Sequence, residues 1–75
     1  MNFDKFTIKM QEAIESAVTL AESNQNSEVI PAHILKALTE QKDGVLRPLF
    51  EKLGVSPDSV ISAMDGIIAK LPKAY

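Results

Sequence analysis

The spacing of the apolar residues constrains the fold of this chain more than any other feature. From Phe6 to Ala21 these residues recur at steps of three and four with polar residues between them, as on one face of an α-helix. Asp4 or Thr7 is expected to cap the start of this helix through a side-chain oxygen, and the polar run "ESNQNSE" is expected to end it. No strand-like alternation occurs along the chain, so the sequence predicts helices.

A second helix is expected to begin within "VIPAHI". Proline has a fixed φ that suits the first helical position, which places Pro31 there and makes Ile30 the N-cap residue. Val29 would then pack on Ile34, the contact known as a hydrophobic staple. We expect a short helix whose buried face contains Ile34, Leu35 and Leu38.

The stretch "VSPDSV" repeats this pattern at the start of another expected helix. Ser56 is the expected N-cap residue and Pro57 the first helical residue, while Asp58 lies near the positive end of the helix dipole. Val55 would pack on Val60 as a second staple. The buried face is expected to contain Val60, Ile61, Met64, Ile67, Ile68 and Leu71.

Between these two helices lies a third apolar segment, "VLRPLFEKLG". It is expected to end at Gly54, because glycine suits the left-handed position after a helix, and Pro48 is expected to make its first turn irregular or late. Its apolar face would contain Leu46, Leu49, Phe50 and Leu53. The sequence therefore predicts an all-α domain, a small bundle of four short-to-medium helices.

Composition excludes several classes of partner. The 75 residues carry 8 basic and 10 acidic side chains without a basic stripe, so we expect neither nucleic acid nor a membrane as a partner. No apolar stretch approaches the roughly 20 residues of a membrane span, and the start "MNFDKF" does not resemble an export signal. The absence of cysteine suits a reducing cytoplasm, where we expect the chain to act.

His33, the only histidine, is the first candidate for chemistry. A catalytic triad or a zinc site needs further ligands or bases, and the chain has no cysteine and no second histidine. We expect a structural, neutral His33 at the start of its helix, accepting a hydrogen bond from an amide of the first turn. The carboxylates fall mostly opposite the apolar stripes, and no glycine-rich phosphate loop occurs. The sequence thus predicts no catalytic residue, no cofactor and no metal.

The amount of apolar surface leaves two interpretations open. Four short helices either close around one core or leave an apolar groove exposed for another protein. Composition alone does not decide between them.

Four stretches in order carry a resemblance to a known family: "KFT" before an alanine-rich helix, "IPAHILKAL", "LFEKLGV" and the closing "LPK". This order resembles the N-terminal repeat of the Clp chaperone ATPases. The opening "MNFDKFT" and the residues Ile30, Pro31 and Ala32 are most similar to the protein disaggregases of that family, because the protease-partner members usually have Gly-Thr-Glu before the histidine.

The resemblance implies an amino-terminal domain of two such repeats related by a pseudo-twofold axis. Residues 1–75 would then form a single repeat, one half of that domain and a fragment of a larger chain. It implies binding of exposed hydrophobic segments of unfolded or aggregated proteins, on behalf of a hexameric ATPase that threads them through its ring. The alternative is a structural or regulatory module that docks the ATPase ring or an adaptor protein. No nucleotide site is implied for this chain, which is not expected to be an enzyme.

Two further expectations follow from the resemblance. Thr7 corresponds to a surface residue at the start of the first helix that the family uses in client handling, and a helix-capping role for Thr7 stays open beside it. The absence of the second repeat would leave an apolar surface bare, so we also expect self-association in which one chain replaces the absent half.

Overall fold

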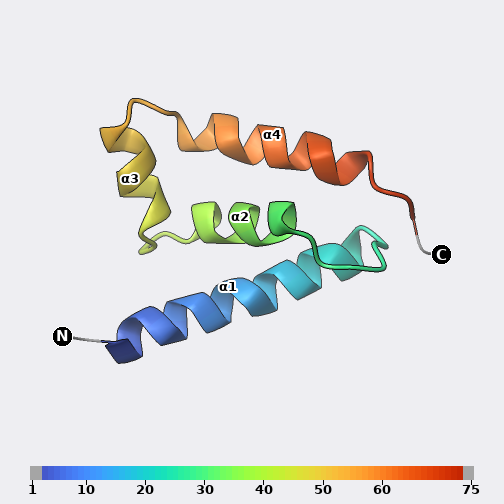
Figure 1. Ribbon diagram of the computed structural model, residues 1–75, viewed down its shortest axis with the longest axis horizontal. Coiled ribbons are helices and arrows are strands. Elements are labelled where there is room, and N and C mark those ends of the chain that lie inside the picture. The colour runs from blue at the N-terminus through green and yellow to red at the C-terminus, as the bar shows by residue number, and fades with distance from the viewer. Residues whose placement is uncertain (1–2, 74–75) are drawn as a thin grey trace.

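The computed structural model describes residues 3–73, and the side chains of residues 7–73. Four α-helices follow one another along the chain (Figure 1): α1 Phe3–Ser23, α2 Pro31–Glu40, α3 Leu46–Lys52 and α4 Pro57–Ala69. Strands are absent from these residues. The predicted all-α fold of four helices is confirmed.

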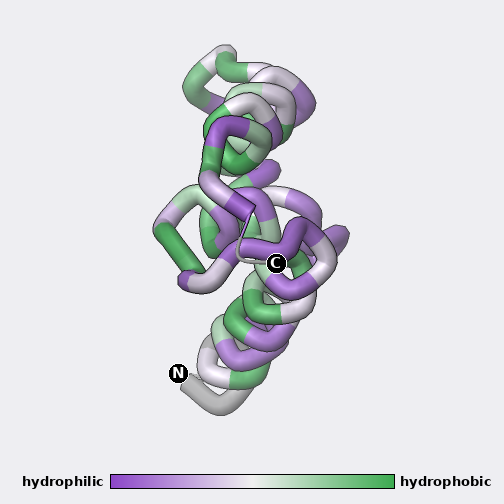
Figure 2. Tube along the Cα trace, turned by 90° about the vertical axis from the view of Figure 1, so that its right-hand side faces the viewer, coloured by the Kyte–Doolittle hydropathy of each residue, from purple (hydrophilic) through white to green (hydrophobic). Residues whose placement is uncertain are grey.

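The helices form a flat layer with α2 in its middle (Figure 1). α1 and α4 run antiparallel to α2 on its two sides, and α3 connects α2 to α4 at one end of the layer. Within residues 3–73, α1 contacts α2 and neither α3 nor α4. The molecule measures 43 × 29 × 15 Å, and a view along its longest axis shows the helices standing one above another (Figure 2). The helices therefore do not enclose a common core.

A small core made mainly of alanines lies where α1 packs on α2. Ala13 and Ala17 of α1 and Ala37 of α2 are buried, and Ile34 and Leu38 pack against them. Such short side chains allow two helix axes to approach closely. The other flank of α2 faces α4, whose buried residue is Ile68.

Several apolar residues that were expected in the core are exposed instead. Ile14 and Val18 of α1 are 47% and 41% exposed, Ile67 of α4 is 45% exposed, and Leu49 and Leu53 lie on the surface at α3. Each outer helix has too few neighbours to cover an apolar stripe more than about 100° wide. Others from the predicted faces are only half-buried: Ile34, Leu35, Leu38, Leu46, Phe50, Val60, Ile61, Met64 and Leu71.

The predicted start of α1 is wrong by about one turn. Because α1 begins at Phe3, both Asp4 and Thr7 lie within the helix and neither is its cap. Its end is a Schellman motif centred on Gln25, which has a left-handed φ of 59°. The amides of Gln25 and Asn26 donate to the carbonyl oxygens of Glu22 and Ala21, at 3.0 and 2.9 Å.

The two proline starts adopt related geometries. Pro31 and Pro57 are the first residues of α2 and α4, after the N-cap residues Ile30 and Ser56. The Ser56 hydroxyl accepts a long hydrogen bond of 3.4 Å from the amide of Ser59. The valines that precede the two caps are each 40% exposed. The staple contacts of Val29 with Ile34 and of Val55 with Val60 stay predictions.

The third helix ends as predicted and begins earlier. Gly54 has a φ of +75°, and the amides of Gly54 and Val55 donate to the carbonyls of Glu51 and Phe50 in a second Schellman motif. The expected late or irregular start at Pro48 is wrong, because α3 begins at Leu46 and Pro48 is its third residue. A proline is tolerated there, since the first four amides of a helix have no partner within it.

Candidate functional site

Thr7 lies beside an open, largely apolar hollow on the outer part of α1. The hollow has a volume of about 450 Å³ and is lined by Thr7, Met10, Gln11, Ile14 and Glu15. Thr7 and Ile14 are exposed, and Met10 is half-buried. Residues spaced by three, four and seven positions share one side of a helix, so the threonine hydroxyl lies next to two apolar side chains.

Met10 also lines a smaller hollow of about 170 Å³, together with Lys9, Leu38, Gln41, Val45 and Leu46. Gln41 donates a hydrogen bond of 2.7 Å from its side-chain amide to the carbonyl of Lys9, which fixes the end of α2 against α1. Arg47 donates from Nε to the carbonyl of Thr39 at 3.0 Å and holds the start of α3 against α2. We call the combined surface the Met10 surface, defined by Thr7, Met10, Ile14, Leu38, Val45 and Leu46.

The two broad sides of the layer differ in chemistry, and α1 shows this most clearly. At about 100° of rotation per residue, Thr7, Ile14 and Val18 lie about 60° to 100° to one side of the buried Ala17. The other side of α1, about 100° to 160° of rotation from Ala17, carries polar residues: Glu12, Ser16, Thr19 and Ser23.

The same division continues across α2 and α4. Lys36 of α2 forms an ion pair with Asp65 of α4, which marks the polar side of both helices. Four apolar residues of α4 and its C-terminal extension lie about 100° to 160° of rotation away from Asp65: Val60, Met64, Ile67 and Leu71. We call one broad side of the layer the apolar face and the opposite side the polar face. The apolar face carries these four residues together with Thr7, Met10, Ile14, Val18, Ile34 and Leu38.

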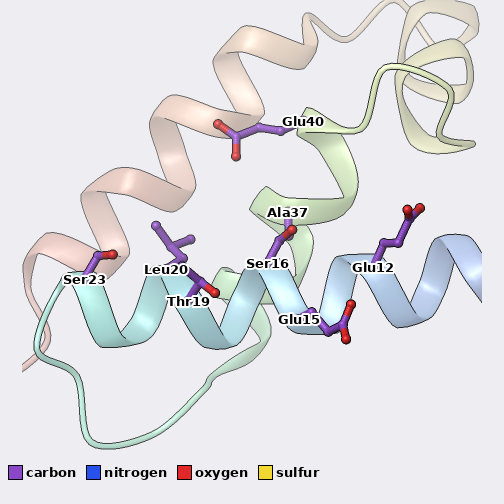
Figure 3. Close-up of a pocket in the computed structure, with 8 residues that line it drawn as sticks. All are labelled: Glu12, Glu15, Ser16, Thr19, Leu20, Ser23, Ala37 and Glu40. Atoms are coloured by element: carbon purple, nitrogen blue, oxygen red, sulfur yellow. The ribbon is translucent and has the colours of Figure 1, made fainter.

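The polar face contains a hollow of about 570 Å³, which is shown in Figure 3. Its three carboxylates come from Glu12 and Glu15 on α1 and from Glu40 at the end of α2. The side chains of Glu12 and Glu15 point in different directions, and all three glutamates are exposed. Among residues 7–73 there is no group of three or more histidine or acidic side chains that could hold a metal ion. The arrangement is a solvated acidic surface without the desolvated pair that general acid and base catalysis needs.

His33 is completely buried and connects the α1–α2 loop to the start of α2. Its Nδ1 accepts a hydrogen bond of 2.9 Å from the amide of Ile30, and its Nε2 lies 2.9 Å from Oδ1 of Asn26. Because Nδ1 accepts, the ring proton belongs on Nε2 and is donated to Asn26, which makes His33 a neutral imidazole in this geometry. The contact with Ile30 forms one half of a capping box, with histidine in the place usually taken by glutamate or glutamine. An amide of the first turn was expected as the donor, but the donor is the amide of the N-cap residue.

Sequence reasoning missed several residues of these sites. The interval between Thr7, Met10 and Ile14 would have indicated one helix face, and with it the first hollow. No local signal points to Gln41 or Asn26, because their partners lie on other elements and are brought near only by the fold. Asn26 is buried, and its side-chain nitrogen has no hydrogen-bond partner within the described residues.

Comparison with known proteins shows the family to which this chain belongs. Residues 5–75 match the family described as "Clp repeat (R) N-terminal domain". The chain is 39% identical over 72 residues to the chaperone protein ClpB of Porphyromonas gingivalis, and 41% identical over 73 residues to that of Bacteroides thetaiotaomicron. The ClpB of Mycobacterium leprae is 43% identical over 68 residues. These alignments cover 96%, 97% and 91% of this chain and 8% of each relative.

The matched segment corresponds to the amino-terminal domain of those chaperones and to none of their ATPase part. That domain is not catalytic, so the chain itself is not an enzyme. Within residues 3–73, none of the helices combines the length and the apolar character that crossing a bilayer requires. With nearly its whole length matched, the chain belongs to the Clp N-terminal domain family.

Proposed function

We propose that this chain binds exposed hydrophobic segments of unfolded or aggregated proteins on the Met10 surface, as the amino-terminal part of a cytoplasmic ClpB-like disaggregase. The observation that carries the proposal is the pair of hollows that share Met10 as a lining residue, one of them also lined by Thr7. The side chains of residues 7–73 leave their apolar walls open, with Ile14 47% and Val45 66% exposed. Apolar surface of this kind on a small domain marks a site for protein contacts.

Binding on this surface is expected to be weak and reversible. An unfolded segment loses conformational entropy when it is ordered on a small contact area, and only the remaining free energy appears as affinity. The hydroxyl of Thr7 stands at the edge of the hollow, where it offers a hydrogen bond to the backbone of a bound segment. Weak capture suits a domain that passes its clients on to a motor.

The chain offers matched variants for a test. Ile8 and Ile14 are both exposed isoleucines of α1, at 55% and 47%, and only Ile14 lines the hollow. Fluorescence anisotropy of labelled casein, a natively unfolded polypeptide, measures binding to each variant. Ile14→Ser should weaken binding about fivefold through the lost apolar contact, while Ile8→Ser should not. Equal effects of the two variants would show that binding does not use this surface.

Thr7 and Thr19 provide a second pair, because both are exposed and they lie on opposite faces of α1. Thr7→Ala should reduce casein binding and Thr19→Ala should leave it unchanged. Retention of full affinity by Thr7→Ala would remove the role proposed for its hydroxyl.

The acidic polar face favours a second candidate, a module that docks a basic surface of the ATPase ring or of an adaptor. Glu12, Glu15 and Glu40 supply the negative charge for such contacts. Reversing charge with Glu12→Lys and Glu40→Lys should then weaken capture of the isolated ring and leave casein binding intact, because neither residue lines the two hollows of the Met10 surface. Loss of ring binding by Ile14→Ser alone would favour the apolar surface for both partners.

A further inference from the structure

An aspartate followed directly by a glycine occurs twice in the sequence, as Asp43–Gly44 and as Asp65–Gly66. In such a pair the backbone nitrogen of the glycine can attack the side-chain carboxyl carbon of the aspartate, because glycine has no side chain to obstruct the approach. The carboxyl group must rotate toward the next amide, so the reaction needs a backbone that can leave its folded conformation. The fold gives the two pairs different surroundings.

Asp43–Gly44 lies in the turn between α2 and α3. The side chain of Asp43 is 81% exposed, and its carboxylate lies 3.9 Å from Nζ of Lys9 in an ion pair that water screens. The amide of Gly44 donates a long hydrogen bond of 3.3 Å to the carbonyl of Gln41, which closes the turn. Gly44 itself is buried, but this hydrogen bond belongs to no helix. A local opening of the turn is therefore enough to release the Gly44 nitrogen.

Asp65–Gly66 lies within α4, where both residues are held in place. The carboxylate of Asp65 forms an ion pair with Lys36 of α2. Gly66 follows the first turn of α4, so its amide is an internal donor of the helix and its backbone has the α conformation. Attack on Asp65 therefore requires part of α4 to unwind first.

We propose that Asp43 is a site of spontaneous isomerisation to isoaspartate in the folded chain, and that Asp65 is protected. The Gly44 nitrogen forms a bond to Cγ of the protonated Asp43 carboxyl, and the amide hydrogen and the carboxyl hydroxyl leave as water, which gives a cyclic imide. Water then adds to one of the two imide carbonyls. Addition at Cγ restores aspartate, whereas addition at the backbone carbonyl of Asp43 breaks its bond to the Gly44 nitrogen. The main chain of this second product runs through Cβ and Cγ, so it is longer by one carbon while its mass is unchanged.

The turn has no room for a longer backbone. A Cβ added at Gly44 would lie 2.9 Å from Cβ of Gln41 and 3.2 Å from the carbonyl oxygen of Leu38. A larger residue does not fit in place of Gly44, so the reactive pair is built into the turn. Gln41 also donates to the carbonyl of Lys9 and holds the end of α2 against α1. Isomerisation of Asp43 should therefore loosen the junction of α1 and α2, and this consequence goes beyond the proposed function and does not depend on it.

The experiment ages the folded 75-residue chain at neutral pH and maps its peptides by electron-transfer fragmentation, which distinguishes isoaspartate from aspartate. Isoaspartate should accumulate at Asp43 at least about tenfold faster than at Asp65, because opening a helix costs more free energy than opening a turn. In concentrated urea, where neither pair is folded, the two rates should be similar, which controls for the sequence around each pair. Equal rates in the folded chain, or no isoaspartate at Asp43, would overturn the proposal.

Asp43→Glu is the matched variant for the consequence. It keeps an exposed carboxylate in the turn, but cyclisation through glutamate needs a larger ring, so we expect no isomerised residue at this position. After ageing, the unmodified chain should contain a fraction that unfolds at a lower urea concentration, and Asp43→Glu should contain none. An isomerised fraction with an unchanged urea midpoint would refute the effect on the α1–α2 junction. An equal loss of stability in both aged chains would refute it as well, because the damage would then lie outside Asp43.

Discussion

Replacing His33 removes the buried link between the α1–α2 loop and the start of α2. His33 is completely buried and makes two hydrogen bonds of 2.9 Å. Each bond is worth about 1 kcal/mol net, and truncation to alanine also leaves a cavity and two unpaired partners, Ile30 N–H and Asn26. We expect His33→Ala to lower the free energy of unfolding by about 2 to 4 kcal/mol, a large share of the roughly 4 to 11 kcal/mol available to a domain of this length.

His33→Gln separates the two bonds. A glutamine at this third helical position accepts a hydrogen bond from the N-cap amide, as in a capping box, and it leaves the Asn26 carbonyl without its donor. We expect His33→Gln to lower the free energy of unfolding by about 1 to 2 kcal/mol, which is less than the loss expected for His33→Ala. Combining His33→Ala with Asn26→Ala in a double-mutant cycle should give a coupling of about 1 kcal/mol.

Urea denaturation followed by far-ultraviolet circular dichroism measures all of these differences, at one fixed low concentration so that self-association does not contribute. NMR of the imidazole nitrogens supplies an independent check and should show a proton on Nε2 and none on Nδ1. The reasoning is refuted if the free energy of unfolding of His33→Ala lies within about 0.5 kcal/mol of that of the unmodified chain, or if His33→Gln is no more stable than His33→Ala. The opposite tautomer would contradict the assigned network.

Two further predictions use backbone conformation and the same urea assay. Gln25→Gly should raise the free energy of unfolding by up to about 1 kcal/mol, because Gln25 holds a left-handed φ of 59° that glycine adopts without strain; a loss of stability would contradict this. Gly66→Ala should stabilise α4 by up to about 1 kcal/mol, since Gly66 is a helical residue, and an added Cβ would have no atom within 4 Å apart from its chain neighbours and the backbone of its own helix. Gly54→Ala serves as its control and should destabilise, because Gly54 has a φ of +75°, and equal signs for the two alanine variants would count against the argument.

Local features of the sequence were sufficient to predict the four helices, the starts of α2 and α4 and the end of α3, but not the start of α3 at Leu46. Pro31, Ser56, Pro57 and Gly54 act through their own φ preference or their nearest neighbours, and their structural positions follow from those properties alone. The start of α1 was placed too late, because Asp4 and Thr7 are good capping residues that the helix includes instead. A capping preference alone does not show which of several candidate residues caps the helix.

Burial was predicted less well, for a different physical reason. Periodicity shows that Ile14 and Val18 share an apolar stripe, but the presence of a helix opposite that stripe is a property of the whole fold. The Met10 surface depends in the same way on α2, whose C-cap residue Gln41 donates to the Lys9 carbonyl, and on the start of α3, which Arg47 holds against α2. The hydrogen bond from His33 to Asn26 joins residues seven positions apart across an irregular loop, where no sequence periodicity applies.

The central position of α2 has a consequence for how the chain opens. Among residues 3–73, α2 is the one helix that α1 packs on, along a row of alanines, whereas α2 also packs on α3 and α4. Detaching α1 breaks one helix pair, but unfolding α2 removes a packing partner from each of the other three described helices and leaves only the small contact between α3 and α4. Amide protons of α1 should therefore exchange through a partial opening of lower free energy, while those of α2 exchange only when the whole chain unfolds. The order of release along this molecule is thus set by the number of neighbours a helix has rather than by its length, and its longest helix is the first to leave.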